Sequence, residues 1–264
     1  MPFTMSHPAA VLPLLRGARA RGPLVAAALV AGSMAPDLPF FADSLLPGVY
    51  RYGGLTHRWW AVATVDVALA SGLVAGWHGL WRDGTAVLLP AAVAGPRRVP
   101  ARPGWVALSA ALGAASHVGW DSFTHPGRAG VRALPALTRT VGGVPLYTVL
   151  QYGTSLVGLA LVARHATRAA AGAARPVPRP GPGRPAAAAA LAVAAAAGAG
   201  RRLARRRGGV VDEACFGAGA GAAVALAAVG AVARAGRRRC PDPRWRAGRA
   251  GTASGPSGAA RQGW

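Results

Sequence analysis

Three apolar segments constrain the fold of this chain more than any other feature. They cover residues 61–81, 105–123 and 145–163. A helix that crosses a bilayer needs about 20 predominantly apolar residues, so each segment predicts a transmembrane helix. Charged residues make up only 14% of the chain, against about 25% in soluble domains. The sequence therefore predicts an all-α fold, a multipass transmembrane helical bundle in the cell membrane, with the lipid bilayer as its surroundings.

Two shorter apolar segments precede these three. Residues 8–21 and 23–36 are both too short to cross a bilayer. A group of basic residues at 16–21 lies between their apolar parts. We expect them to form two short helices packed as an N-terminal helical hairpin. Together with the three longer segments they define a membrane helical core at residues 1–165.

The composition changes after the third long segment. Residues 166–185 are rich in Arg, Pro and Gly and predict a linker. Residues 186–233 predict tail helices: 214–233 is long enough to cross, whereas 186–200 is nearly all alanine and only weakly hydrophobic. Residues 234–264 form a basic C-terminus that we expect to be disordered.

The tail is strongly basic. The chain has a net charge of +22, and all 30 of its basic residues are arginine. A cluster of like charges beside a membrane attracts anionic lipids at about 1 kcal/mol per residue. Anionic lipid is therefore the expected partner of the Arg-rich tail, and no specific nucleic acid is expected. The glycines between Gly217 and Gly221 lack the preceding strand of a dinucleotide-binding motif, and we interpret them as sites of close helix packing.

The basic loops predict an orientation. Arginines cluster at 16–21, 82–102 and 164–168, and basic loops stay on the cytoplasmic side. The opposite ends of the apolar segments then share the outer face of the membrane. Those ends carry three histidines and two aspartates, namely His7, Asp37, His57, His117 and Asp121. Five further arginines would lie outside, so the rule is satisfied only in part.

Imidazole and carboxylate groups are ligands that suit zinc and similar divalent ions. His117 and Asp121 are four residues apart and share one face of a helix. Asp37 lies in a proline-rich turn that fixes its carboxylate. His57 directly precedes the 61–81 segment. The sequence Pro126-Gly127 ends the helix after His125, so we expect His125 to turn away and to be a weaker ligand.

At these residues the chain resembles a family of uncharacterised multipass bacterial membrane proteins. The similarity lies in the N-terminal sequence PFTMSHPA at residues 2–9, in GSMAPD at 32–37, in DSFTHPG at 121–127 and in PLY at 145–147. It covers roughly residues 1–165.

More distantly, the order of motifs is similar to that of membrane-bound metal-dependent hydrolases. These proteins have an early His, a Pro-Asp pair, a His-Arg pair and a His-x3-Asp motif. The residues that match in that order are His7, Asp37, His57 and the pair His117/Asp121. The chain departs from the pattern after Asp37, where Leu38 and Pro39 follow, and after Arg58, where two tryptophans follow.

The resemblance implies hydrolysis at the outer membrane surface of a phosphoester or lipid-like substrate. The expected ligands of one divalent metal, most simply zinc, are His7, Asp37, His57, His117 and Asp121. Among these, Asp37, His57 and Asp121 are the expected catalytic residues, and Arg58 is expected to bind an anionic substrate. The alternative is a non-catalytic membrane protein whose polar cluster is structural or conducts ions or protons.

Overall fold

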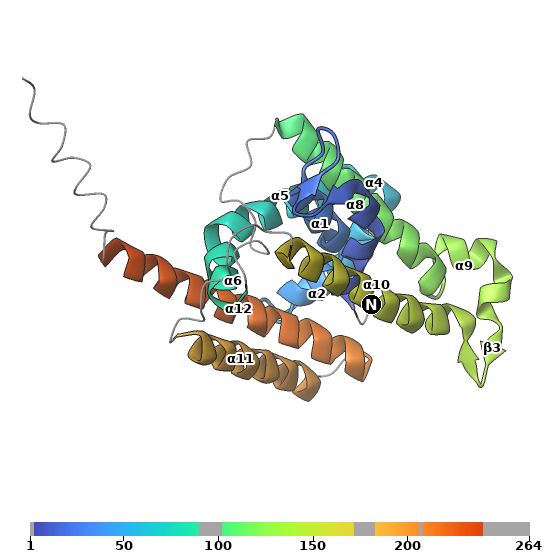
Figure 1. Ribbon diagram of the computed structural model, residues 1–264. Helices are drawn as coiled ribbons and strands as arrows, with labels where there is room; N and C mark the ends of the chain where they lie inside the picture. The colour runs from blue at the N-terminus through green and yellow to red at the C-terminus, as the bar shows by residue number, and fades with distance from the viewer. Residues whose placement is uncertain (1–2, 90–101, 172–182, 206–207, 240–264) are drawn as a thin grey trace, which may run out of the picture.

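The computed structural model describes residues 3–89, 102–171, 183–205 and 208–239. Within these residues the protein is helical apart from two hairpins with strands of two residues each, which confirms the predicted all-α class (Figure 1).

The N-terminal hairpin differs from the prediction in its first arm. Residues Thr4–Leu14 form a 3-10 helix, η1, rather than an α-helix, and Pro8 and Pro13 lie inside it. Proline has no backbone N–H and disrupts the bonding of an α-helix interior, which accounts for the tighter winding. A β-hairpin of β1 (Leu15–Arg16) and β2 (Arg19–Ala20) leads into the second arm, α1 (Ala26–Met34). η1 packs between α1 and the later helix α10.

A series of short helical elements follows α1. It consists of η2 (Ala35–Asp37), α2 (Leu38–Ala42), η3 (Val49–Tyr52), α3 (Gly53–Thr56) and α4 (Trp59–Val62). From α4 the chain continues almost without interruption through α5 (Val65–Gly76), a π-helical turn η4 (Trp77–Trp81) and α6 (Arg82–Leu88). The predicted 61–81 span lies inside this apolar stretch.

The central helix is α8 (Pro103–Thr124). It is followed by α9 (Ala129–Ala133), η5 (Pro135–Thr138) and a hairpin of β3 (Thr140–Val141) and β4 (Val144–Pro145). The remaining helices are α10 (Leu146–Ala171), α11 (Arg184–Ala204) and α12 (Val210–Arg239).

Four helices of the described chain are long and apolar enough to cross a membrane. They are Trp59–Leu88, Leu146–Ala171, Arg184–Ala204 and Val210–Gly236. The chain is therefore a membrane protein in contact with lipid. The alanine-rich segment, predicted to be too weakly hydrophobic, belongs to the third of these helices. The 105–123 segment forms α8 but is not among the four, because it carries polar residues along its buried side, including Ser109, His117 and Asp121.

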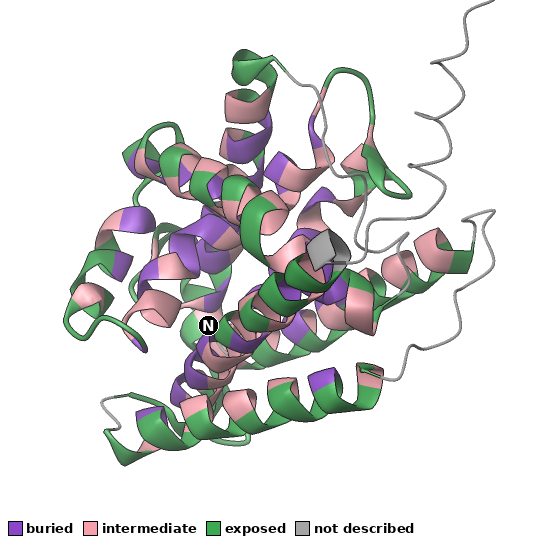
Figure 2. Ribbon diagram, turned by 90° about the vertical axis from the view of Figure 1, so that its left-hand side faces the viewer, coloured by how far each residue is buried: buried purple, intermediate pink, exposed green. Residues whose placement is uncertain are grey.

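α1 and α8 cross at very close range, and this crossing lies at the centre of the buried residues in Figure 2. A Cβ atom at Gly32 would clash with the carbonyl of Ala110, and one at Gly113 would clash with the carbonyl of Leu29. Small residues at both positions bring the two backbones together. The crossing therefore fixes the position of the turn of α8 that follows Gly113.

The tail helices pack on the core. α11 and α12 pair through Gly198, Gly217 and Gly221, whose Cβ positions are filled by backbone of the facing helix. This agrees with the interpretation of these glycines as packing sites. α12 also lies against α6 and η4, where the indole Nε1 of Trp81 donates a 2.9 Å hydrogen bond to the carbonyl of Ala223.

The ends of the helices differ from the predicted segment boundaries. α10 continues to residue 171 and α12 to residue 239, so the predicted linker at 166–185 and basic C-terminus at 234–264 both begin within helices. The rest of the predicted linker up to residue 182, and residues 240–264, lie outside the described residues.

Candidate metal centre

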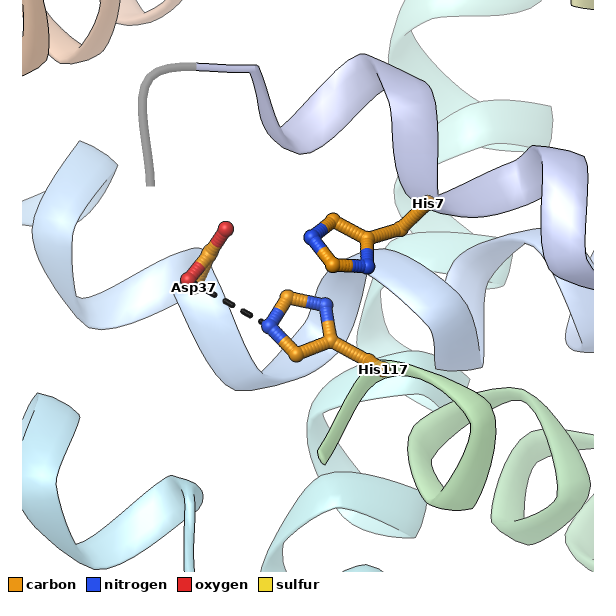
Figure 3. Close-up of side chains that lie close together, drawn as sticks. All are labelled: His7, Asp37 and His117. Atoms are coloured by element: carbon orange, nitrogen blue, oxygen red, sulfur yellow. Dashed lines mark ion pairs between the residues drawn. The ribbon is translucent and has the colours of Figure 1, made fainter. Parts of the chain in front are cut away.

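The five histidines and aspartates predicted as metal ligands come together at one buried point. His7 comes from η1, Asp37 from η2, and His57 from the residue that ends α3. His117 and Asp121 lie one turn apart on α8. None of the five is more than 5% exposed. Figure 3 shows His7, Asp37 and His117 meeting from three separate segments of the chain.

Two imidazole nitrogens of this cluster face each other, and one oxygen of each aspartate lies close to both of them. The Nε2 atoms of His57 and His117 lie 3.2 Å apart. Asp37 Oδ1 lies 3.3 Å from the first of these nitrogens and 3.5 Å from the second. Asp121 Oδ2 lies 3.4 Å from His57 Nε2 and 3.5 Å from His117 Nε2. We call these four atoms the donor cluster.

Backbone carbonyls orient both imidazole rings. His57 Nδ1 donates a 2.7 Å hydrogen bond to the carbonyl of Gly53, and His117 Nδ1 donates a 2.8 Å bond to that of Ser33. A carbonyl only accepts, so each ring carries its proton on Nδ1 and presents Nε2 to the cluster. Histidines that bind metals through Nε2 are commonly oriented by a hydrogen bond of this kind from Nδ1.

The two carboxylates keep one oxygen each without a hydrogen-bond partner among the described residues. These oxygens are Asp37 Oδ1 and Asp121 Oδ1, and both are buried. The hydroxyl of Thr4 donates a 2.6 Å hydrogen bond to Asp37 Oδ2 and holds that carboxylate in place. Burial alone would raise the pKa of Asp37, but the neighbouring imidazoles of His117 and His57 hold its pKa well below the usual range.

These distances fit a shared cation better than direct hydrogen bonds. Charge-assisted bonds between imidazolium and carboxylate measure about 2.7–2.9 Å, shorter than any His–Asp distance in the cluster. Around a tetrahedral zinc ion with bonds of about 2.0–2.2 Å, neighbouring donor atoms lie about 3.3–3.6 Å apart. The five measured distances run from 3.2 to 3.5 Å. Without a cation or protons on the two Nε2 atoms, four electron-rich atoms would face each other in a buried space.

His7 lies beside the donor cluster and, with Asp37 and His117, forms a second group whose ligand atoms all lie within 4.8 Å of one another. Its ring stacks on that of His117 with centroids 3.8 Å apart, and its Nε2 lies 3.7 Å from Asp121 Oδ1. Burial and the neighbouring His117 keep the pKa of His7 well below its ordinary value. His7 is therefore a neutral imidazole, the form that binds metals.

His125 stays at the site, which corrects the expectation that it turns away. Its backbone is extended (φ −129°, ψ 141°), but Nδ1 still lies 3.6 Å from Asp121 Oδ1. Burial lowers the pKa of His125 to about 4. Gln151 on α10 lies with its side-chain nitrogen 3.1 Å from His125 Nε2.

The predicted substrate contact, Arg58, is exposed beside His57. A second arginine, Arg128, was missed by the sequence analysis. Its guanidinium donates a 3.3 Å hydrogen bond to the carbonyl of His57 and so places a positive charge beside the cluster. The two residues are 71 positions apart in the chain, and no sequence pattern links them.

Other ionisable residues have separate environments. Asp66 on α5 is fully buried, and its carboxylate has no hydrogen-bond partner among the described residues, although it lies close enough to interact electrostatically with His57 and His117. His165 Nε2 bonds to the carbonyl of Gly17 in the N-terminal β-hairpin. This bond places His165 beside the basic turn of that hairpin.

Comparison with curated proteins and with solved structures gives no match. A family model does match, over residues 1–231, and it is described as a domain of unknown function, DUF4184. The match extends well past residue 165, where the recognised similarity ended, and includes most of the tail helices. The tail is thus part of the family's shared domain, and the chain belongs to the DUF4184 family.

Proposed function

We propose that this protein is a membrane-bound metal-dependent hydrolase acting on a phosphoester or lipid-like substrate. The observation that carries the proposal is the donor cluster, whose His–His and His–Asp distances of 3.2–3.5 Å match the spacing of ligands around one divalent ion. These buried donor atoms form no direct hydrogen bonds of normal length with one another. A cation among them would account for their arrangement.

The ligands in this proposal are His57, His117, Asp37 and Asp121, with His7 next to them. Two imidazoles and two carboxylates without a thiolate suit zinc, and two carboxylates balance the charge of one divalent ion. A bound divalent metal would lower the pKa of a coordinated water to about 7 and so supply the nucleophile for hydrolysis.

The chain's own residues would hold and orient the reacting groups. The carbonyls of Gly53 and Ser33 fix the two histidine rings. His7, as a neutral buried imidazole, is available to accept a proton as a general base. Arg128 lies beside His57 and Arg58 is exposed next to it, so both are suited to an anionic substrate group such as a phosphoester.

The membrane context favours a lipid-like substrate. The cluster is formed by η1, η2, α3 and α8, and two of the four apolar helices, Trp59–Leu88 and Leu146–Ala171, pack against these elements. A substrate with an acyl chain would remain in the bilayer while its headgroup reaches the site. We place the reaction at the outer membrane surface because the basic loops predict that orientation.

The test combines metal analysis with an activity assay on the full-length protein purified in detergent. We expect at least one tightly held zinc ion per chain. We also expect the protein to hydrolyse bis-p-nitrophenyl phosphate or phosphatidic acid, and this activity should be abolished by chelators and restored by zinc. His117→Ala should lose both metal and activity, whereas His165→Ala should keep both. A wild type without metal, together with ion flux in liposomes, would favour the non-catalytic alternative.

A further inference from the structure

A cavity lies where the end of α11 and the start of α12 meet the loop between α2 and η3. Its volume is about 60 Å³. A single water molecule needs about 10–15 Å³ of cavity volume, so this cavity has room for a group the size of a phosphate. The ionisable residues that line it are Asp43, Tyr50, Arg201, Arg202, Arg205 and Glu213.

Arg202 and the two carboxylates form the frame of the cavity. Arg202 is 6% exposed and pairs with Asp43 at 2.8 Å and with Glu213 at 2.6 Å. The other oxygen of Asp43 accepts hydrogen bonds from the backbone N–H groups of Gly48 at 2.7 Å and of Tyr50 at 3.1 Å, which fixes the loop. Both carboxylates in the lining are thus engaged by Arg202, and their charges are compensated within the frame.

Two further arginines of the lining are not compensated in this way. Arg201 and Arg205 are exposed, and neither forms an ion pair with another described residue. They are four residues apart, and like charges at this spacing on a helix repel each other. Three arginines against two carboxylates leave the lining with an excess of positive charge. An anion between Arg201 and Arg205 would relieve their repulsion.

Tyr50 adds a neutral hydrogen-bond donor to the same cavity. The guanidinium of Arg202 lies 5.7 Å from the centroid of its ring, which holds the ring against the frame. Burial, together with the nearby carboxylates of Glu213 and Asp212, raises the pKa of Tyr50. Its hydroxyl therefore stays protonated and can donate to an anion.

The cavity lies at the end of the molecule that carries the donor cluster. The ring of Phe40 lies 4.8 Å from that of Tyr50 and 5.8 Å from that of His57. The loop that lines the cavity also exposes two apolar side chains, Leu45 and Leu46, which are 55% and 65% exposed. Apolar side chains beside a basic cavity suit a lipid, whose acyl chains and phosphate headgroup need both kinds of surface.

We propose that Arg201, Arg205 and Tyr50 form a binding site for a phosphate group, and that the headgroup of an anionic lipid supplies it. Guanidinium groups bind phosphate through strong charge-assisted hydrogen bonds, and the tyrosine hydroxyl adds a third donor. The site is separate from the donor cluster and does not depend on a bound metal. It assigns one defined position to the general attraction between a basic tail and an anionic membrane.

The test is a titration of the full-length protein in detergent with phosphatidylglycerol, followed by native mass spectrometry. We expect one tightly bound lipid per chain, and weaker binding of the zwitterionic phosphatidylcholine. Arg201→Gln with Arg205→Gln should weaken phosphatidylglycerol about 10-fold or more, because hydrogen bonds to charged groups are lost. The matched control is Arg164→Gln with Arg168→Gln, an exposed pair with the same spacing on α10, which should bind as wild type.

A further variant separates loss of the donor from loss of folding. Tyr50→Phe keeps the ring and removes only the hydroxyl, so it should weaken the lipid about 10-fold at an unchanged unfolding midpoint. Inorganic phosphate that binds with the same dependence on Arg201 and Arg205, when the lipid does not bind, would retain the site with free phosphate as its ligand. Binding of neither probe, or equal lipid affinity in the wild type and the Arg201/Arg205 variant, would overturn the proposal.

Discussion

The Nε2 atoms of His57 and His117 lie 3.2 Å apart although both rings donate their Nδ1 protons to backbone carbonyls. Each ring therefore directs its Nε2 atom at the other. Two carboxylate oxygens face the same pair of nitrogens at 3.3–3.5 Å. Such a group is stable when a cation lies among the four atoms, and this relationship underlies the predictions about metal binding.

Thr4 holds one of the carboxylates. Its hydroxyl donates a 2.6 Å hydrogen bond to Asp37 Oδ2, which leaves Oδ1 directed at the two histidines. Outer-shell partners of this kind contribute about 10–100-fold to metal affinity. We expect Thr4→Val to weaken zinc binding by that factor, measured by competition with a chelator. Thr138→Val removes a hydroxyl that bonds only within an exposed turn and should leave affinity unchanged. Equal zinc affinity in the wild type and both variants would show that the Thr4 hydroxyl does not support metal binding through Asp37.

The α1–α8 crossing depends on Gly113. A Cβ atom there would clash with the carbonyl of Leu29 and with the backbone of Gly32 and Ser33. Gly113→Ala should therefore destabilise the protein by about 1–3 kcal/mol through overpacking. It should also weaken metal binding, because His117 lies one turn further along α8 and bonds to the carbonyl of Ser33.

Gly119 provides the matched control on the same helix. Its Cβ position has ordinary contact with Trp59 at 3.8 Å. Gly119→Ala should be neutral or stabilising by up to about 1 kcal/mol, because alanine is the better helix former. Thermal unfolding in detergent, followed by circular dichroism, measures both variants. Equal midpoints for the two would show that the crossing tolerates a side chain at Gly113.

Arg202 attaches the tail to the part of the core that carries the site. It is 6% exposed and forms ion pairs with Asp43 at 2.8 Å and with Glu213 at 2.6 Å. Breaking a buried pair by removing one partner costs about 3–5 kcal/mol. We expect Arg202→Ala to lose that much stability in chemical unfolding. Arg201→Ala changes the exposed neighbour and should stay within about 0.5 kcal/mol of wild type.

The tail contacts predict that the tail contributes to the stability of the core. Phe216 of α12 is 2% exposed and packs against Phe40 and Phe41 of α2, with ring centroids 5.2 and 5.1 Å apart. Phe40 in turn lies 5.8 Å from the ring of His57. A chain ending at residue 171 should therefore be less stable than one ending at residue 239, and a truncated chain of undiminished stability would show that the tail is separable after all.

The sequence predicted the features that depend on local spacing. The helical period puts His117 and Asp121 on one face of α8, and the alternation of apolar segments and basic loops assigns the remaining motif residues to one side of the membrane. The apolar content of the chain was also sufficient to predict its all-α class. None of these inferences required knowledge of a contact between distant residues.

The features that the sequence did not reveal depend on such contacts. The Pro126-Gly127 break was expected to carry His125 away, but α9 and Gln151 lie close by and its ring remains at the site. Asp43 and Glu213 both form ion pairs with Arg202, which lies 159 residues after Asp43, and no local pattern links the three. Arg128 is recognisable only once the carbonyl of His57 lies beside it.

The orientation of the site in the membrane remains a prediction of the charge rule. We expect Gly54 and Ala136, both exposed on the end of the molecule that carries His57 and Asp121, to face the extracytoplasmic side. Ala18, exposed in the N-terminal hairpin among Arg16, Arg19 and Arg21, should face the cytoplasm. A buried position such as Gly130 is unsuitable for a cysteine label, because a Cβ atom there would clash with the ring of Phe123.

Single cysteines at these three positions, in a chain with Cys215→Ser and Cys240→Ser, allow a direct measurement in intact cells. A membrane-impermeant thiol reagent should label Gly54→Cys and Ala136→Cys at once, and Ala18→Cys only after the cells are lysed. This labelling pattern is expected because short loops that carry arginines near the ends of spans stay on the cytoplasmic side. Labelling of Ala18→Cys in intact cells together with protection of the other two would place the metal centre on the cytoplasmic face. A lipid-like substrate would then have to enter from the inner leaflet.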